Sequence, residues 1–348
     1  MKTIIKSGLM LTALVSTPSF AGYTFDLTDK DKITFGGYIK ADARYTDGNI
    51  GARDYWIGGG TVLDNNQSNF AISARETRFN AKYQHGDVTG FIEMDFDGGG
   101  GNEVISNSAH PRLRHAFIKY KNVLAGQTWS TFMNTSSIVE AVDFGGPLVA
   151  TAFIRQGQIR YTNGGLQLAI ENPETYGGYR GTATTKDDSV PDFIAKYTFK
   201  GDWGNVAVSA LARQLKSLTN TSQSAFGYGI SGRIKTFGKD DFRFQLHGGE
   251  VGRYVGATSS VDMVGEEVEE STSILVAYRH FWTKDMRSTL FYGNATNDLS
   301  DRDRSHWGVN LFKNVTKQLS FGVEVGNFEM AKANADSNYL QLSAKYVL

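Results

Sequence analysis

The amino-acid sequence predicts an all-β protein: a transmembrane up-and-down antiparallel β-barrel of about 16 strands, with a long third loop folded into the pore. Three observations support this fold class. Segments with alternating apolar and polar residues recur from residue 33 to the C-terminus. Short turns and long loops alternate along the chain. One long loop, residues 129–155, carries more apolar side chains than a solvated loop would keep in water.

The first alternating segment, ITFGGYIKADARY (residues 33–45), shows the pattern clearly. Phe35, Ile39 and Tyr45 share one face, and charged residues share the other. A charged face opposite an apolar face that ends in aromatic residues is typical of a strand between lipid and an aqueous channel. Comparable segments recur up to NYLQLSAKYVL (residues 338–348), which resembles the C-terminal signal of outer-membrane proteins.

The connections between these segments differ sharply in length. Residues 85–87 and 121–122 form short turns, whereas residues 46–69, 97–111 and 254–270 form long loops. Short turns at one end and long loops at the other describe an up-and-down barrel. An even strand number near sixteen predicts a barrel wide enough for an aqueous channel.

The third long loop reads WSTFMNTSSIVEAVDFGGPLVATAFIR (residues 129–155). It is too polar and irregular for a pair of strands, but it carries large apolar side chains that include Phe132, Ile138, Val142, Phe144, Leu148, Val149 and Phe153. A short helix on the outside of a soluble domain is the alternative. We favour a loop folded into the barrel that narrows the channel.

Residues 1–21 are predicted to be a cleaved signal peptide. Lys2 and Lys6 precede an apolar stretch, residues 8–15, that is too short to span a bilayer. Ser19-Phe20-Ala21 is a small-x-small cleavage pattern. We therefore expect an exported protein whose residues 22–348 form a single transmembrane barrel domain.

The composition argues against several classes of function. Without Lys2 and Lys6 the chain has 34 basic and 36 acidic residues, a balance that does not suggest nucleic-acid binding. It contains no cysteine, and its six histidines lack metal-ligand spacing. Because neither a GxSxG nor an HExxH motif occurs, we expect no enzyme activity, no catalytic residues, no cofactor and no metal. The acidic residues between Glu266 and Glu270 could hold divalent cations that bridge lipopolysaccharide, although a solvated loop is the favoured interpretation.

Alternation predicts that many basic side chains line the pore: Lys40, Arg44, Arg78, Lys82, Arg160, Lys196, Arg213, Arg233, Arg243 and Arg279. Arg155, at the end of the inserted loop, is also expected to face the lumen. A guanidinium is permanently charged and matches a carboxylate at two points, so a series of arginines favours anions. Glu140 and Asp143 of the loop would face this series and create a transverse field. Alternatively, these charges pair with one another across a wet lumen.

Three segments, FGGYIKADARY, ARETRFNAKY and RLRHAFIKYKNVLAGQTWSTF, resemble the DcaP-like family of trimeric outer-membrane porins of Gram-negative bacteria. The resemblance covers essentially the whole mature chain. It implies a homotrimer of sixteen-stranded barrels, a third loop in each pore, an arginine-lined channel and passive uptake of small anions, including dicarboxylic acids. It also suggests that Arg114 lies in the pore, although simple alternation places it outside unless a bulge occurs near His115.

The leading hypothesis is therefore an outer-membrane porin for passive diffusion of small hydrophilic solutes, with a preference for small (di)carboxylates. Its expected partners are further copies of itself, outer-membrane lipid and lipopolysaccharide, and small anionic solutes, but not nucleic acid. A general porin without selectivity is the alternative within this class. An outer-membrane enzyme or an adhesin barrel are alternatives from other classes, and the predicted arginine lining favours neither.

Overall fold

The computed structural model describes residues 22–57, 60–102, 104–177, 183–185, 188–217, 219 and 221–348. The predicted signal peptide, residues 1–21, lies outside the described residues. Antiparallel β-strands dominate, and the helices among the described residues are four 3-10 turns. None of these helices is long and apolar enough to cross a membrane.

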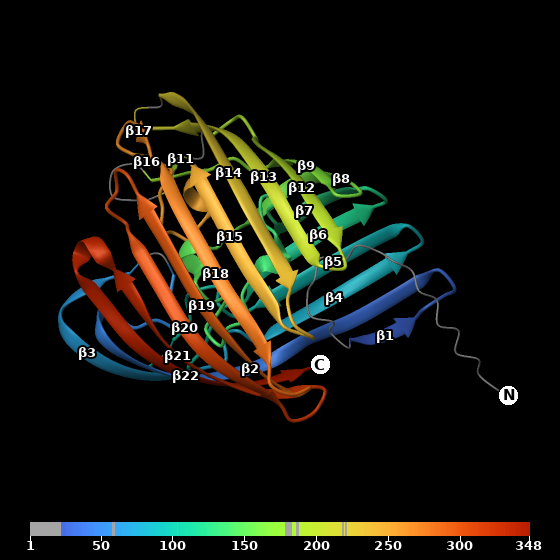
Figure 1. Cartoon of the computed structure of the whole chain (residues 1–348). Coiled ribbons are helices and arrows are strands. Elements are labelled where there is room, and N and C mark those ends of the chain that lie inside the picture. The colour runs from blue at the N-terminus through green and yellow to red at the C-terminus, as the bar shows by residue number, and fades with distance from the viewer. Residues whose placement is uncertain are drawn as a thin grey trace.

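One 18-stranded antiparallel sheet forms the wall (Figure 1). Its first strands are β1 (Tyr23–Asp26), β2 (Asp31–Ile50), β3 (Val62–Ser73), β4 (Arg78–His85), β5 (Val88–Asp95), β6 (Arg112–Tyr120), β7 (Val123–Trp129), β8 (Arg155–Asn163) and β9 (Leu166–Glu171). It continues through β12 (Asp192–Gly201), β13 (Gly204–Lys216), β14 (Ser222–Lys235), β15 (Asp241–Gly249), β18 (Ser271–Phe281), β19 (Met286–Asn297), β20 (Arg304–Asn314), β21 (Leu319–Met330) and β22 (Ala335–Val347).

The short elements lie in the long loops. They are the hairpins β10 (Thr175–Tyr176) with β11 (Ala183–Thr185) and β16 (Met263–Val264) with β17 (Glu267–Val268), and the turns η1 (Thr135–Ser137), η2 (Leu148–Ala150), η3 (Gly252–Tyr254) and η4 (Ala331–Ala333).

Strand β2 closes the barrel. One edge pairs with β22, from Tyr38↔Val347 to Gly48↔Ser337, and the other pairs with β4 and then β3. Strand β1 continues the β22 edge by pairing with residues 32–35. Sixteen strands thus form a closed antiparallel ring with β1 and β3 as additions, which confirms the predicted fold class.

The predicted alternation of faces appears directly in the exposure of the side chains. In β14, Phe226 and Tyr228 are 65% and 61% exposed, whereas Ala225 is fully buried. The same holds in β20, where Trp307 and Val309 are exposed and His306 is buried. The outer wall is therefore apolar, as lipid requires.

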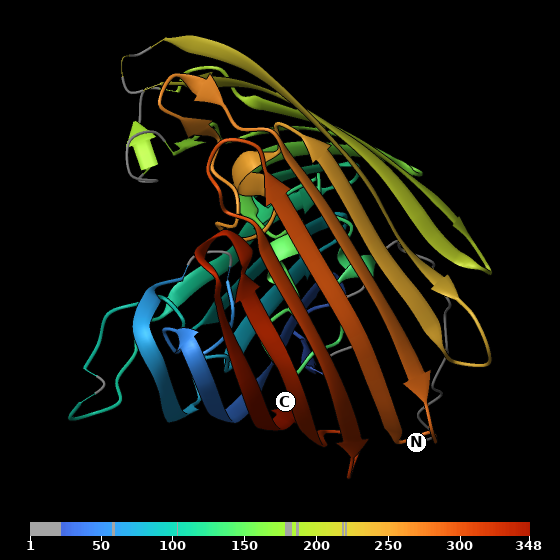
Figure 2. The same cartoon turned by 60° about the vertical axis from the view of Figure 1, so that its left-hand side comes forward.

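One predicted loop is partly strand. Residues 46–69 were expected to form a loop, but β2 continues to Ile50 and β3 begins at Val62. The two strands pair as a ribbon at the barrel rim (Figure 2). Residues 64–70 are exposed on both faces, so the sequence DNNQSN lacks the alternation by which a half-buried strand is recognised.

The third long loop, residues 130–154 (the inserted loop), folds inside the ring of strands (Figures 1 and 2). Its turn η1 packs on β14 and β15, and η2 packs on β15, β18, β19 and β20. Val142, Leu148 and Val149 are at most 1% exposed. Gly145 and Gly146, with φ of +80° and +68°, supply the left-handed conformations with which the loop reverses.

Candidate pore and its basic lining

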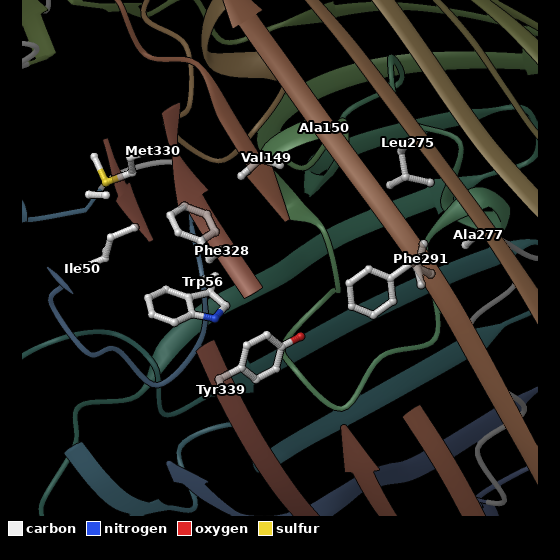
Figure 3. Close-up of a cluster of buried hydrophobic side chains, with 12 residues drawn as sticks. Ile50, Trp56, Val149, Ala150, Leu275, Ala277, Phe291, Phe328, Met330 and Tyr339 are labelled. Carbon is white, nitrogen blue, oxygen red and sulfur yellow. The ribbon is translucent and has the colours of Figure 1, made fainter. Parts of the chain in front are cut away.

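Apolar side chains fix the inserted loop against one side of the wall (Figure 3). Val149 and Ala150 of the loop pack with inward-facing Leu275, Ala277 and Phe291. The lumen face is therefore not polar throughout, because part of it serves as the core on which the loop rests.

A second loop joins this cluster from the other side. Trp56, between β2 and β3, is 1% exposed and stacks on Phe328 with ring centroids 5.0 Å apart. Its backbone amide donates to the Asp143 carboxylate at 3.2 Å. The first loop thus also folds inward, which the alternation pattern did not predict.

Two predicted pore cations hold the backbone of the inserted loop. Lys40 Nζ donates to the Val142 carbonyl at 3.1 Å and pairs with Glu76 at 2.7 Å. Lys196 Nζ donates to the Met133 carbonyl at 2.5 Å. Both side chains are inside the barrel and buried, and their first role is to fasten the loop.

Arg44 is inside and 4% exposed, and its Nε and Nη2 have no hydrogen-bond partner among the described residues. Its Nη1 lies 3.4 Å from Asp143 and donates to Gln341 at 2.6 Å. Its guanidinium also lies 4.9 Å and 4.6 Å from the ring centroids of Trp56 and Tyr339.

Arg114 also lies inside the barrel. The pairing of β5 with β6 shifts register between Glu93 and Met94, so that Arg114 is bulged and His115 opposes Glu93. Arg114 then pairs with Glu93 at 2.9 Å and with Asp95 at 2.7 Å. An inward position for Arg114 requires a bulge near His115. One extra residue in a strand moves the side chains on either side of it to opposite faces of the sheet.

Arg213 points inward too, but it binds a carboxylate of β12 and one of the loop between β15 and β18 rather than facing an open channel. It pairs with Asp192 at 3.2 Å and with Asp262 at 2.5 Å, and none of its side chain is exposed.

Four arginines on the side of β14 to β19, Arg233, Arg243, Arg279 and Arg287 (the paired arginines), share two carboxylates, Asp241 and Glu140. Glu140, on the inserted loop, lies 2.9 Å from Arg279 and 2.6 Å from Arg287. Burial alone would raise the pKa of Glu140, but the hydrogen bonds and charges of Arg287 and Arg279 lower it to about 2. These arginines therefore anchor the inserted loop.

Two arginines on the opposite side, Arg78 of β4 and Arg155 of β8 (the stacked arginines), are held by rings. Arg78 lies 5.3 Å from the ring centroid of Tyr38 and 5.4 Å from that of Phe144. Arg155 lies 4.8 Å from that of Trp129. Both are half-buried, and no carboxylate of the described residues forms an ion pair with either.

Arg160 resembles the stacked arginines in having no carboxylate within ion-pairing distance among the described residues, but it is 7% exposed. Its Nη2 donates to the Trp129 carbonyl at 3.0 Å, whereas its Nε has no partner. Arg160 is therefore largely covered, and the charged groups with which it interacts are Glu171 and Lys196.

The two loop acids lie beside arginines of the predicted basic series. Glu140 pairs with Arg279 and Arg287, and Asp143 lies beside Arg44. Within the described part of the chain, neither forms an ion pair with a stacked arginine.

The acidic run near Glu266 is structural in part. Glu269 is fully buried and accepts hydrogen bonds from the backbone amides of Leu299 and Ser300 at 2.8 and 2.9 Å. Across the described residues, no group of three or more His, Cys, Asp or Glu side chains could hold a metal ion.

Sequence reasoning missed several residues of this interior. Arg287 lies in a segment whose faces are mixed, so alternation could not place it. Phe144 was read as an apolar loop residue and Trp129 as the first residue of the loop, with no signal that either would stack on an arginine. The inward course of Trp56 likewise gave no local signal.

A closed antiparallel barrel with an apolar outer wall and a basic interior narrowed by an inserted loop defines a porin-class channel. Residues 24–329 match the family described as DcaP outer membrane protein, and the chain belongs to this outer-membrane family. The proteins it resembles are channels and porins rather than enzymes. No curated protein sequence matches the chain.

Solved structures share the fold. The crystal structure of the outer membrane channel DcaP of Acinetobacter baumannii is 22% identical, with a TM-score of 0.79 over 93% of this chain and 99% of that one. OmpT of Vibrio cholerae lacking loop L8 is 11% identical, with a TM-score of 0.61 over 92% and 100%. An anion-selective porin from Comamonas acidovorans is 10% identical, with a TM-score of 0.60 over 92% and 100%. At these identities the likeness is one of fold.

Proposed function

We propose that this outer-membrane channel lets small hydrophilic solutes diffuse passively and favours anions such as small mono- and dicarboxylates. The observation that carries the proposal is the pair of stacked arginines. Each guanidinium is held by an aromatic ring rather than by a carboxylate, so its positive charge is not neutralised, and its remaining donors, other than the buried Arg78 Nε and Arg155 Nη1, are left to a passing anion.

The positive charge around them is concentrated. Arg155 experiences the charges of Arg112, Arg114 and Arg78, and Asp95 is the main opposing charge. Across the lumen, the four paired arginines share only two carboxylates. Rings of basic side chains of this kind select anions in pores.

The test is the double variant Arg78→Ala/Arg155→Ala, measured as a single-channel reversal potential in a salt gradient. We expect a shift toward cation preference and a larger loss of flux for a small dicarboxylate than for a neutral sugar of similar size. Barrel assembly should persist, because lumen substitutions tune selectivity more than stability.

Arg53→Ala is the matched control, because Arg53 is an exposed arginine of the first loop. If the double variant keeps the wild-type reversal potential, or loses sugar and dicarboxylate flux equally, the channel is a general porin and the anion preference is wrong.

We also infer a homotrimer embedded in outer-membrane lipid and lipopolysaccharide. Strand β3 supports this, because its outer edge is unpaired among the described strands and residues 64–70 are exposed. An unpaired edge strand is usually covered by another chain or protected. The mass of the protein in mild detergent should correspond to three copies, and a monomer there would contradict the inference.

A further inference from the structure

The sixth long loop was predicted from residue 254 to residue 270, and most of residues 250–270 is buried inside the barrel mouth. It connects β15 to β18 and contains η3 and the β16–β17 hairpin. Tyr254, Val255 and Met263 are at most 3% exposed. Figure 2 shows the turn η3, in orange, above the green inserted loop. We call residues 250–264 the capping loop.

The capping loop is docked on the returning limb of the inserted loop. Ala152 and Val255 form an isolated antiparallel bridge. Three hydrogen bonds join the loops: Phe153 N to the Tyr254 carbonyl at 3.1 Å, Gly256 N to the Thr151 carbonyl at 3.0 Å, and Ser259 Oγ to the Val149 carbonyl at 2.9 Å. The Phe132 and Tyr254 rings meet edge to face at 5.9 Å.

Gly256 makes this close approach possible. Its φ is +82°, and a Cβ there would lie 2.7 Å from the Val149 carbonyl oxygen and 1.5 Å from Ser259 Oγ. Any larger residue would therefore have to push the two loops apart.

A buried ionic group fastens the capping loop to the wall. The Asp262 carboxylate receives both terminal nitrogens of Arg213, at 2.5 and 3.0 Å, and the backbone amides of Tyr176 and Arg253, at 2.6 and 2.9 Å. Asp262 and Arg213 are 1% and 4% exposed. Bidentate geometry with further donors is the arrangement in which a buried ion pair fixes one conformation.

We propose that the capping loop is a second constriction element, which clamps the inserted loop and thereby limits the size of solute that passes. Lys196 holds the early part of the inserted loop at Met133. Its middle is held by Lys40, by the ion pairs of Glu140, and by Glu324, which accepts from the backbone amides of Val142 and Asp143 at 2.7 and 3.1 Å. Its returning limb, residues 149–153, touches the wall through Val149, Ala150 and the Ala152 amide, which donates to Gln245, and the capping loop adds the bridge and hydrogen bonds described above. Asp262 with Arg213 secures the capping loop to β13. This inference requires only that the chain form a channel, not that the channel prefer anions.

The first test compares two glycines of the same long loop. Gly256→Ala introduces a side chain at the contact with the inserted loop, whereas a Cβ at Gly265, where φ is +63°, would have no neighbouring atom within 4 Å. We expect Gly256→Ala to raise single-channel conductance and admit larger neutral polyethylene glycols, with the reversal potential unchanged. Gly265→Ala imposes similar backbone strain and should leave size exclusion as it was. Equal behaviour of the two variants would overturn the proposal.

The second test does not depend on tolerance of the Gly256 change. Asp262→Asn should loosen the capping loop and raise conductance. Adding Ala152→Cys and Val255→Cys should restore the wild-type conductance after oxidation but not after reduction. The natural chain contains no cysteine, and a non-hydrogen-bonded antiparallel pair places side chains close together.

Because oxidation leaves the charge of the lining unchanged, recovery of size exclusion would report the clamp alone. If the oxidised triple variant retains the conductance of Asp262→Asn, the capping loop does not set the pore width. A selectivity change in Arg78→Ala/Arg155→Ala is a separate outcome, so either proposal can fail without the other.

Discussion

The stacked and the paired arginines present the same chemical group in opposite settings. The paired arginines lie against carboxylates, with Asp241 within 3.2 Å of three of them. The stacked arginines lie over the rings of Tyr38, Phe144 and Trp129. Both groups face inward, so alternation alone does not distinguish them.

The partner decides what each arginine can do. A carboxylate neutralises a guanidinium and occupies its donors, so the paired arginines serve mainly to hold the inserted loop. A ring orients the guanidinium and leaves its charge and several donors unused. An anion passing through the lumen therefore interacts differently with the two sides of the barrel.

The largest expected effect tests the paired side. Asp241→Asn leaves Arg233, Arg243 and Arg279 without their shared buried carboxylate. We expect a loss of about 3–5 kcal/mol in the free energy of unfolding, since removing one partner leaves uncompensated buried charge. The measurement is the temperature at which the folded band disappears on a gel in SDS.

Asp301→Asn is its control, because the Asp301–Lys332 pair is exposed and exposed pairs contribute little. Equal stability of the two variants would show that the paired arginines are not stabilised by Asp241. The proposed difference between the paired and the stacked arginines would then be wrong.

A smaller effect tests the stacked side. Trp129→Leu removes the ring beneath Arg155 but no charge. We expect the free energy of unfolding to fall by about 0.5–2 kcal/mol, because the cation–π contact is lost. The reversal potential should keep its anionic sign, because both stacked arginines remain. Trp307→Leu, on the lipid face, serves as the control. If Trp129→Leu shifts the reversal potential as far as Arg78→Ala/Arg155→Ala does, the anion selectivity depends on the ring rather than on the charge of the arginines.

The smallest effect separates the two acids of the inserted loop. Burial raises the pKa of Asp143 to about 7, against the charge of Arg44 and with the repulsion of Glu324 and Glu76. Glu140, by contrast, stays ionised above about pH 2. A carboxyl that binds its proton more tightly when folded stabilises the fold at low pH and loses that contribution as the pH rises toward 7.

The free energy of unfolding of the wild type should therefore decrease as the pH rises, because the contribution of Asp143 is lost. Between the unfolded and folded pKa values of Asp143, this contribution falls by up to about 1.4 kcal/mol per pH unit. Asp143→Asn should flatten the slope of stability between pH 5 and pH 7. Glu140→Gln should leave that slope in place, although it lowers stability overall. An identical slope in wild type and Asp143→Asn would place the Asp143 pKa outside this range.

Local patterns predicted much of the fold. The period-2 alternation predicted the outward faces of β2, β14 and β20, because a strand between lipid and lumen must be apolar on one side. The apolar content of residues 129–155 predicted that this loop would be buried. The same signal is present in the capping loop, where Val251, Tyr254, Val255, Val261 and Met263 occur within thirteen residues, although residues from 254 onward were read only as a long connection.

Other features gave no local signal. Simple alternation placed Arg114 outside, and only the register shift between β5 and β6 turns it inward. Residues 62–69 read as a loop because both faces of β3 meet water.

The sequence by itself determined most strands of the wall other than β3, which of their faces are apolar and that many basic side chains lie inside, because these follow from neighbours two residues apart. The tertiary structure alone decided the partner of each charge. Glu140 meets Arg287, and Asp262 meets Arg213, only because barrel closure brings together segments 147 and 49 residues apart. Those contacts divide the arginines into the ones that hold loops and the ones left to meet a solute.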